Sequence, residues 1–548
     1  MSGIRQRQKQ STVASPVSEG KTSRMMRGTR LFRGGIFMDL TLLAVFIILA
    51  YVFIARRSNI SKADAIITKV QEKDGIRSDG NLQHLIDARV KKSPDYRSAE
   101  CKNKKYHITD QVSIVTVFFD YSFHDLKTTV GSILHNTPME LVKEIIIVDD
   151  ASSLDYIVDK SREYVKTIDK ARLIRNREHL SMGASRMTGL KETKADTVIF
   201  LDTNVVVSKG WLEPLMGLLN TESNVIAVPH FDSINDPVSY EYKGTIDSLT
   251  ASLSWSLSVR MTKSEEQLTD PTMPLKSPAL RGNAMAVNKA HLQALGGYDE
   301  DLGEGGGHNL ELSLRAWLCG SKVLISPCSR VGVINLQDPV KVMSHANVRR
   351  ITELWFSNRK SIVFRNTGIQ NTMTDSERAS FLKRQQQLSN LHLKCNDINW
   401  FFQNIAGHLP TPSDKAVQFG MLKCKTGRCA RVGDDKRIDL GKCSPEHYHI
   451  TLTRLMFEYT DDGLITSAGQ CLGVQQTAYI LLEDCISGDS KQKWHYKDGR
   501  FVNEWSQYCM MHVTDPDKKM GGKRQIAMAQ DCSSASEEQF VSFDFISV

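Results

Sequence analysis

Residues 296–332 read GGYDEDLGEGGGHNLELSLRAWLCGSKVLISPCSRVG and carry more information about the fold than any other segment of the chain. Glycine fills four of the five positions from Gly303 to Gly307. Such a loop could cradle a phosphate, but the Lys-Ser or Lys-Thr pair that completes a phosphate-binding loop does not follow it. We therefore interpret residues 303–307 as a flexible loop in front of the segment that begins at His308.

Upstream, two apolar runs are predicted to be buried strands. Val112–Phe119 is rich in β-branched residues, and Glu144–Val148 is nearly all apolar. Between them, Asp125–His135 has the spacing of a helix. A strand, a helix and a strand in this order predict a βαβ unit, so we expect an α/β domain built on a parallel sheet.

Acidic residues follow these strands directly. Asp149 and Asp150 end the second run, and Asp202 ends a third run, Thr197–Leu201. Because parallel sheets bind ligands at the carboxyl ends of their strands, we expect the carboxylates to cluster at one rim of the sheet and to mark the site. The alternative is that Asp150 and Asp202 only cap the loops that follow them.

The character of the sequence changes at Gly407–Asp414, where the prolines and turn formers of GHLPTPSD indicate a linker. Beyond it, short strands are predicted among repeated cysteines and Gln-x-aromatic elements. The repeated elements are Gln470-Cys471-Leu472-Gly473 with Gln492-Lys493-Trp494, and Cys509-Met510-Met511 with Gln539-Phe540. The period is ~40–45 residues, so three repeats fit in the remaining chain.

Ile36–Ala55 is an apolar run interrupted only by Asp39. It is predicted to be a transmembrane helix, since ~20 helical residues cross a bilayer core. A cleaved signal peptide is the alternative, but it has a shorter apolar core and a small-residue cleavage site, whereas Arg56-Arg57 follows here. Eight Lys and Arg and one Glu precede this run, so we expect that side in the cytosol and the rest in a lumen.

The N-terminal basic residues also explain the charge of the chain. They supply +7 of the formal net charge of +8, so the remaining residues are nearly neutral together. No basic surface for nucleic acid is predicted.

All eleven cysteines follow the predicted membrane helix, and seven of them lie beyond residue 415. This distribution favours disulfides in an oxidising compartment. Zinc is the competing interpretation, but Cys424-x4-Cys429 is the only short spacing and has no histidine pair at ligand spacing.

In order and spacing, these segments resemble the polypeptide N-acetylgalactosaminyltransferase family. The matching segments are residues 143–152, 200–202, 210–215, 296–332 and 353–355. The resemblance implies a Rossmann-like glycosyltransferase domain of GT-A type, a C-terminal ricin-type β-trefoil lectin domain and an N-terminal transmembrane helix. The implied divisions are a cytosolic tail (1–35), a signal-anchor (36–55), a stem (56–100), a catalytic domain (101–405), a linker (406–414) and a trefoil (415–548).

The resemblance also implies a reaction and a location. Members of the family are retaining enzymes that transfer GalNAc from UDP-GalNAc to Ser or Thr hydroxyls of acceptor proteins. They use Mn²⁺, which neutralises the charge that develops on the leaving UDP. We expect the same activity here, in a single-pass type II protein of the Golgi membrane whose catalytic part is luminal, with no role for nucleic acid.

The family's site positions can be transferred residue by residue. Those for the UDP-sugar fall on Asp150, Arg186, Asp202 and Thr203, the catalytic positions on His308 and Asn309, and the metal positions on Asp202, Asn204 and Val333. At the last two positions the family has histidine. Because an amide is a weaker ligand than imidazole and an isopropyl group cannot ligate, we expect Mn²⁺ to bind poorly.

Further positions depart from the family pattern. His308 replaces a glutamate, Gly305 a tryptophan, Ala184 an arginine, Leu336 a phosphate-contacting arginine, and Phe118–Tyr121 a Phe-His-Asn-Glu turn. His308 could compensate as an acid or base, because histidine titrates near neutral pH. If it does not, the alternative function is that of an inactive pseudoenzyme that acts as a luminal binding or regulatory protein.

The trefoil departs from the family as well. The sugar-binding Cys-Leu-Asp triplet reads Cys471-Leu472-Gly473 in one repeat and Cys509-Met510-Met511 in another. Without the aspartate, sugar hydroxyls lose their hydrogen-bond acceptor, so the repeats are predicted to be structural rather than sugar-binding.

The resemblance implies the pairing of the cysteines. The implied disulfides are Cys101–Cys328, Cys319–Cys395, Cys471–Cys485, Cys509–Cys532, and Cys443 with either Cys424 or Cys429. One thiol is then left without a disulfide partner.

Overall fold

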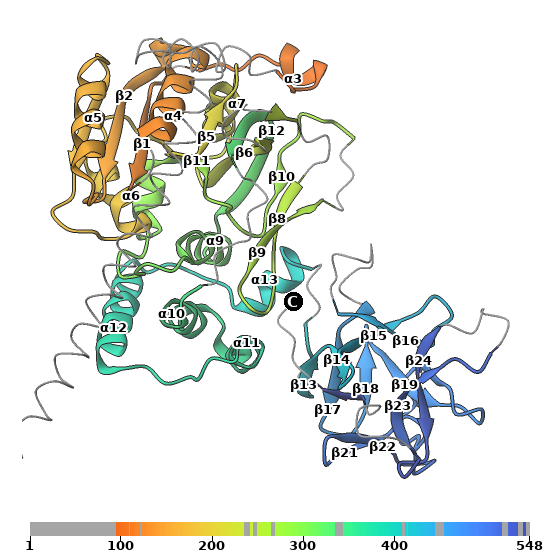
Figure 1. The fold of residues 1–548 in the computed structure, drawn as a ribbon. Coiled ribbons are helices and arrows are strands. Elements are labelled where there is room, and N and C mark those ends of the chain that lie inside the picture. The colour runs from red at the N-terminus through yellow and green to blue at the C-terminus, as the bar shows by residue number, and fades with distance from the viewer. Residues whose placement is uncertain are drawn as a thin grey trace, which may run out of the picture. The chain divides into compact units, whose positions relative to one another are not determined.

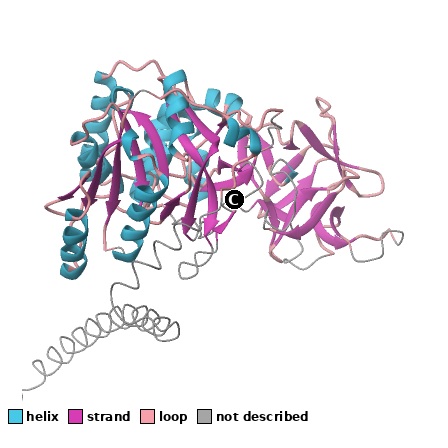
Figure 2. Cartoon of the chain, turned by 90° about the horizontal axis from the view of Figure 1, so that it is seen from above, coloured by secondary structure: helices cyan, strands magenta, loops and turns pink. Residues whose placement is uncertain are grey.

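A computed structural model describes residues 95–543 except 109, 121–122, 235–241, 245–248, 265–268, 335–342, 408–410, 414, 444–453, 518–523 and 535–540 (Figures 1 and 2). The predicted tail, signal-anchor and most of the stem lie outside the described residues, as do Tyr121 and Leu336. Among the residues that are described, no helix combines the length and the apolar composition needed to cross a membrane.

The N-terminal domain is built on a ten-stranded mixed sheet. Its central strand β1 (Val112–Phe118) lies between β2 (Val142–Asp149) and β4 (Thr197–Asp202), and both neighbours run parallel to it. All seven residues of β1 are buried, as the apolar run predicts. The predicted parallel βαβ unit is therefore confirmed.

The structure adds a strand that the sequence analysis missed. β3 (Ala171–Arg175) runs parallel to β2 at the edge of the sheet. Four of its residues are partly buried and Arg175 is exposed, and two of the five are arginines, Arg172 and Arg175. An edge strand has one paired side and needs no continuous apolar run, so the pattern that reveals buried strands does not apply to it.

Beyond β4 the sheet continues through four more strands in the order β11, β6, β12 and β10, with β5 beside β12 and β7 beside β6. Their bounds are β5 Val205–Val207, β6 Val225–Ile234, β7 Tyr242–Lys243, β10 Leu275–Lys276, β11 Ala284–Asn288 and β12 Lys322–Ile334. A separate hairpin pairs β8 (Leu249–Leu253) with β9 (Val259–Lys263).

Helices surround this sheet (Figure 2). α6 packs closely on β1, since a Cβ atom at Gly189 would lie 2.4 Å from Cγ1 of Val115. The α-helices are α3 Ala99–Asn103, α4 Phe123–Asn136, α5 Asp155–Lys166, α6 Met182–Lys191, α7 Leu212–Thr221, α8 Lys289–Ala294, α9 His308–Leu318, α10 His345–Trp355, α11 Lys360–Thr367, α12 Asp375–Asn390 and α13 Ile398–Asn404. Two 3₁₀ turns are η1 Met139–Leu141 and η2 Ser357–Arg359. α3 crosses the predicted stem boundary at residue 100, and the predicted linker falls between α13 and the first trefoil strand.

The C-terminal domain consists of short strands in two sheets. Their bounds are β13 Ala416–Gly420, β14 Leu422–Cys424, β15 Arg428–Val432, β16 Ile438–Lys442, β17 Phe457–Thr460, β18 Ile465–Ser467, β19 Gln470–Val474, β20 Ile480–Glu483, β21 Trp494–Lys497, β22 Arg500–Asn503, β23 Cys509–Thr514, β24 Gln525–Gln530 and β25 Val541–Phe543. Apolar residues from all three repeats, among them Leu440, Leu472 and Met510, share one buried core.

Two disulfides lie within the N-terminal domain and three within the C-terminal domain, and they follow the expected pairing. The structure resolves the one open choice. Cys443 pairs with Cys429, and Cys424 is a buried free thiol. The N-terminal disulfide Cys101–Cys328 ties α3 to β12 across 227 residues of sequence.

Candidate active site

The strands β2, β1 and β4 end at the same edge of the sheet, which we call the rim. Phe118 of β1 is in register with Asp149, and Val117 is in register with Asp202. The expected gathering of acidic residues at one edge is confirmed, but each carboxylate has its own basic partner. Asp149 pairs with Arg175, Asp150 with His179, and Asp202 with Arg186.

Arg186 lies at the centre of a buried hydrogen-bond network. Its Nη2 donates to Oδ1 of Asp202 at 2.7 Å and to the carbonyl oxygen of Gly282 at 2.6 Å. Its Nη1 donates to the hydroxyl of Tyr298 at 2.8 Å and to Oδ1 of Asn309 at 3.1 Å. The network thus brings three predicted site residues, Arg186, Asp202 and Asn309, into contact.

The charge on Arg186 is fixed by these neighbours. Burial alone would lower the pKa of Arg186, but Tyr298 and Asp202 outweigh burial and raise it above its ordinary value. The side chain is 2% exposed, whereas that of Asp202 is 23% exposed. Arg186 is therefore a permanent cation beneath the rim, and both of its terminal nitrogens bind protein atoms rather than facing a nucleotide directly.

A second arginine reaches Asp202 through an amide. Nδ2 of Asn283 lies 3.3 Å from Oδ2 of Asp202 and 3.3 Å from Oδ1 of Asn204. Oδ1 of Asn283 accepts a hydrogen bond of 3.1 Å from Nε of Arg281. The sequence analysis missed Arg281 and Asn283. The only signal was a polar Arg-Gly-Asn triplet directly before the buried strand β11.

The residues at the three metal positions do not fit a manganese ion. One oxygen of Asp202 is paired with Arg186, and the oxygen of Asn204 faces the amide nitrogen of Asn283. Val333 is 1% exposed and has no ligand atom. In the part of the chain that the structure describes, no three His, Cys, Asp or Glu side chains gather where they could hold a metal ion. The chemistry of this donor set is therefore not that of a three-ligand metal site.

Asp150 lies in a second cluster at the rim. Its Oδ1 accepts hydrogen bonds from Nδ2 of Asn176 at 2.7 Å and from the backbone nitrogen of Leu180 at 3.0 Å. His179 lies 3.0 Å from its other oxygen and stacks on Phe119, with 3.7 Å between ring centroids. Asp150 therefore holds the loop that follows β3, whereas the capping alternative concerned the loop that follows Asp150 itself. His179 was not among the predicted site residues.

His308 does not occupy an open position. It is 7% exposed, and its Nε2 lies 2.8 Å from the carbonyl oxygen of Leu302. A Cβ atom at Gly183 would lie 2.5 Å from its ring, so α6 covers it closely. Burial lowers the pKa of His308, which makes the imidazole neutral at pH 7. The expectation that His308 replaces the missing glutamate as an acid or base finds no support in this environment.

Thr203 contributes its backbone to the rim. Its carbonyl oxygen accepts a hydrogen bond of 2.9 Å from Oγ1 of Thr129 in α4, and the residue is 2% exposed. This contact shapes the turn between β4 and β5, and the role of Thr203 in donor binding stays a prediction.

The glycine-rich loop is held by α10. Nδ2 of Asn347 donates to the carbonyl oxygens of Gly303 at 3.2 Å and Gly306 at 2.8 Å. Gly305 has a φ of 110°, a backbone conformation that is strained for residues other than glycine. The loop expected to be flexible is thus attached to α10 at two carbonyls.

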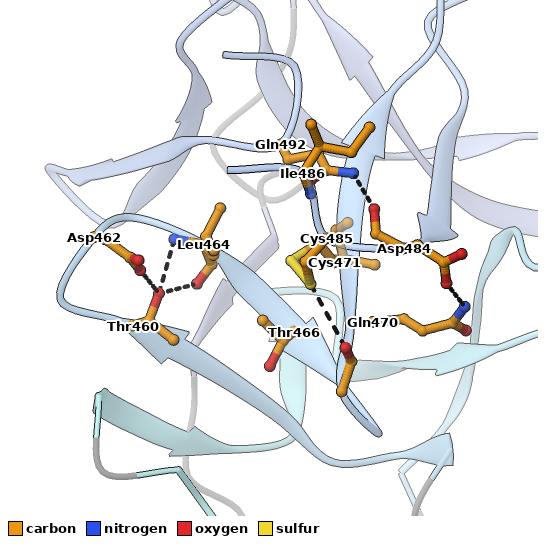
Figure 3. Close-up of a disulfide and its surroundings, with 12 residues drawn as sticks. Thr460, Asp462, Leu464, Thr466, Gln470, Cys471, Asp484, Cys485, Ile486 and Gln492 are labelled. Atoms are coloured by element: carbon orange, nitrogen blue, oxygen red, sulfur yellow. Dashed lines mark hydrogen bonds between the residues drawn. A yellow bond between two sulfur atoms is a disulfide. The ribbon is translucent and has the colours of Figure 1, made fainter. Parts of the chain in front are cut away.

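In the trefoil repeat around Cys471–Cys485, the polar side chains of Gln470 and Gln492 bind other atoms of the same repeat (Figure 3). Gln492 is 1% exposed; it donates to the carbonyl oxygen of Asp484 at 2.9 Å and accepts from the backbone nitrogen of Ile486 at 2.8 Å. Gln470 donates to the side chain of Asp484 at 2.9 Å. These contacts fit the prediction that the repeat is structural.

Comparisons with known proteins agree with this architecture. Residues 113–292 match the family profile "Glycosyl transferase family 2", and residues 418–540 match "Ricin-type beta-trefoil lectin domain". The crystal structure of GalNAc-T7 with UDP, GalNAc and Mn²⁺ is similar in fold, with a TM-score of 0.56 and 23% identity, covering 84% of this chain and 88% of that one.

Sequence relatives define the family more closely. Polypeptide N-acetylgalactosaminyltransferase 6 of Bos taurus is 30% identical over 456 residues, which cover 78% of this chain and 72% of the bovine protein. Polypeptide N-acetylgalactosaminyltransferase 4 of Mus musculus is 28% identical over 436 residues, covering 76% and 75%. On this similarity across both domains, the chain belongs to the polypeptide N-acetylgalactosaminyltransferase family.

Proposed function

We propose that this protein transfers N-acetylgalactosamine from UDP-GalNAc to Ser or Thr hydroxyls of acceptor proteins. The observation that carries the proposal is family membership over both domains. The chain is 30% identical to the bovine polypeptide N-acetylgalactosaminyltransferase 6, and the match covers 72% of the length of that protein. In the reaction, C1 of the sugar exchanges its bond to the diphosphate oxygen for a bond to the hydroxyl oxygen. UDP leaves, and the hydroxyl proton is released.

The rim is where this chemistry fits best. Parallel sheets bind ligands beyond the carboxyl ends of their strands, where Asp150 follows β2 directly and Asp202 ends β4. Asn309, at the start of α9, joins the same network through Arg186. These residues shape the donor side, and no step of the proposal requires His308 to carry a proton.

A transfer assay tests the proposal. The full-length protein, purified in detergent, is incubated with UDP-GalNAc and a panel of Ser- and Thr-containing peptides. We expect peptide products heavier by one N-acetylhexosamine, with one UDP released per transfer. Asp202→Asn should abolish transfer, and Asp159→Asn, in an exposed ion pair on α5, is the matched control. Absence of both products from a folded protein would refute the proposal.

The pseudoenzyme is the second candidate. It is favoured by the pairing of Asp149, Asp150 and Asp202 with basic side chains of the same chain. Under this function, acceptor peptides or partner transferases bind to the protein while UDP does not. Titrating UDP and peptides separately by calorimetry distinguishes the two candidates.

We also propose the location that the sequence predicts, a Golgi membrane protein with one helix at residues 36–55 and both folded domains in the lumen. The five disulfides support an oxidising compartment. Protease protection of a C-terminal tag in sealed Golgi vesicles, lost on adding detergent, is the expected result. Digestion of the tag in intact vesicles would contradict this orientation.

A further inference from the structure

His179 joins two segments that are far apart in the sequence. Its Nδ1 lies 3.0 Å from Oδ2 of Asp150 at the rim, and its Nε2 lies 3.0 Å from Oε1 of Glu304 in the glycine-rich loop. The side chain of Asp150 is 2% exposed, whereas that of Glu304 is 67% exposed. The imidazole therefore bridges a buried carboxylate and a carboxylate that faces solvent.

The ring of His179 is held in one orientation. It stacks on Phe119, with 3.7 Å between the ring centroids and 21° between the ring planes. Nδ1 also lies 3.2 Å from the backbone carbonyl oxygen of Asp150, so this nitrogen faces two oxygens of the same residue. With the ring fixed in this way, Nε2 faces Glu304.

Both ring nitrogens thus face oxygens that accept hydrogen bonds. A neutral imidazole carries a proton on one nitrogen only, so it donates to one carboxylate and turns a lone pair toward the other. The protonated ring donates to both carboxylates. Imidazole changes between these two forms near physiological pH. The contact from Asp150 through His179 to Glu304 is therefore complete only when the ring carries both protons.

The other charged side chains of the segments that meet at this imidazole are bound elsewhere or face solvent. Arg175, at the end of β3, binds Asp149. Asp120, which follows the stacked phenylalanine, binds the backbone and the hydroxyl of Ser153. Arg177–Glu178, directly before the histidine, is exposed and carries one charge of each sign. The two carboxylates in contact with the ring therefore dominate its electrostatic surroundings.

The opposite side of the glycine-rich loop is attached to α10. Nδ2 of Asn347 donates to the carbonyl oxygens of two loop glycines, and the backbone nitrogen of Ser344 donates to that of a third at 3.0 Å. On the rim side, Glu304 contacts His179, which contacts Asp150. The loop thus reaches from α10 to the carboxylate after β2 that is expected to bind the donor.

We propose that His179 is a proton-dependent clasp on this loop. When the ring carries both protons, it fastens the glycine-rich loop over the donor side of the rim. When the ring loses one proton, Glu304 and the loop are released. The fastening concerns the protein alone, whereas the covering of a bound donor rests on the proposed function. His179 is a positioning residue in this account and carries no step of the transfer.

Hydrogen exchange of residues 303–307 in the full-length protein, read by mass spectrometry, tests the clasp. With labelling times scaled to the intrinsic exchange rate, exchange should be about two- to fivefold slower at about pH 6 than at about pH 8, as expected for a partly exposed ion pair. His179→Phe keeps a ring against Phe119 but binds no carboxylate, so its loop should exchange at the faster rate at both pH values. Glu304→Gln can bind either form of the ring, so its loop should exchange equally at both. His495→Phe, from an exposed His–Glu pair of the trefoil, is the control and should match the unmodified protein.

Equal loop exchange at the two pH values in the unmodified protein would overturn the clasp, as would pH-dependent protection that survives in His179→Phe. Stopped-flow displacement of UDP tests the covering of the donor. His179→Phe should release UDP about two- to fivefold faster than the unmodified protein at about pH 6 and at the same rate at about pH 8. Unchanged release at both pH values would overturn the covering. Absence of UDP binding, together with a pH-dependent loop, would overturn the transferase function and support the clasp. If His179→Phe fails to fold by circular dichroism, Glu304→Ala gives the same readouts.

Discussion

Arg186 and Asp202 form an ion pair of 2.7 Å at the end of β4, with the arginine almost completely buried. The same guanidinium also binds Gly282, Tyr298 and Asn309, so it joins α6, β4 and α9. Arg186 therefore supports the fold and also binds one oxygen of the carboxylate that a metal ion would need.

Removing one partner of this pair should destabilise the catalytic domain strongly. Arg186→Ala leaves Asp202 and two carbonyl-type oxygens without their donor, and breaking a buried pair from one side costs about 3–5 kcal/mol. Denaturant unfolding followed by fluorescence measures this loss. Arg162→Ala, which breaks an exposed pair, should cost less than about 1 kcal/mol. Equal effects of the two variants would show that the Arg186 network is not stabilising.

The thiol inventory gives a second prediction. Ten cysteines form disulfides, and Cys424 is buried, 1% exposed. Alkylation without reductant should modify no cysteine in the native protein and Cys424 alone after denaturation, as read by peptide mass mapping. Cys424→Ser should remove that signal and keep all five disulfides. Modification of Cys443 instead would mean that Cys424 pairs with Cys429.

The fold was predictable where a local pattern reports burial. β1, β2 and β4 each contain a mostly apolar, buried run because they are interior strands of a parallel sheet, and Asp149 and Asp202 end β2 and β4 at the rim. β3 was not predictable in this way, because an edge strand tolerates Arg172 and Arg175. The trefoil repeats were visible because cysteines and glutamine–aromatic elements, Gln492-Lys493-Trp494 and Gln539-Phe540, return at a similar spacing.

The site was predictable in its positions but not in its pairings. Asp150 and Asp202 could be placed at strand ends from the sequence. However, Arg186 is separated from Tyr298 by 112 residues and from Asn309 by 123, so no local pattern connects them. Arg281 and Asn283 look like an ordinary turn in the sequence, and only the packing of β11 against β4 reveals their neighbours.

A pH effect on stability follows from Asp125 in the first turn of α4. Burial raises the pKa of Asp125 from 3.8 to about 6. The pKa of Asp125 is higher in the folded state than in the unfolded state. The contribution of Asp125 to the free energy of unfolding is therefore fully present below about pH 4 and is lost as pH rises through about 6. Asp125→Asn should therefore raise the melting temperature at about pH 7.5 and have little effect at about pH 4. The exposed Asp159→Asn should show no such difference, and an equal effect at both pH values would contradict the assignment.

Rebuilding the metal positions is the most direct test of why these residues do not fit a metal ion. The backbone nitrogen of Ile334 donates to the carbonyl oxygen of Asn204 at 2.9 Å, so Val333 of β12 lies beside the turn that carries Asn204, two residues after Asp202. Asn204→His with Val333→His would place two imidazoles beside Oδ2 of Asp202, the oxygen that faces Asn283 rather than Arg186. Two imidazoles and a carboxylate are a donor set that suits Mn²⁺.

In this double variant, Mn²⁺ should strengthen UDP binding by about tenfold or more, whereas the unmodified protein should respond by less than about threefold. Asn204→Gln with Val333→Leu is the matched control, since it changes the same positions without adding imidazole. Transfer is not the readout, because Gly305 and His308 leave the acceptor side altered. Mn²⁺-dependent UDP binding by the unmodified protein would contradict the account, because it would mean that Asp202 and Asn204 already hold the ion despite Arg186.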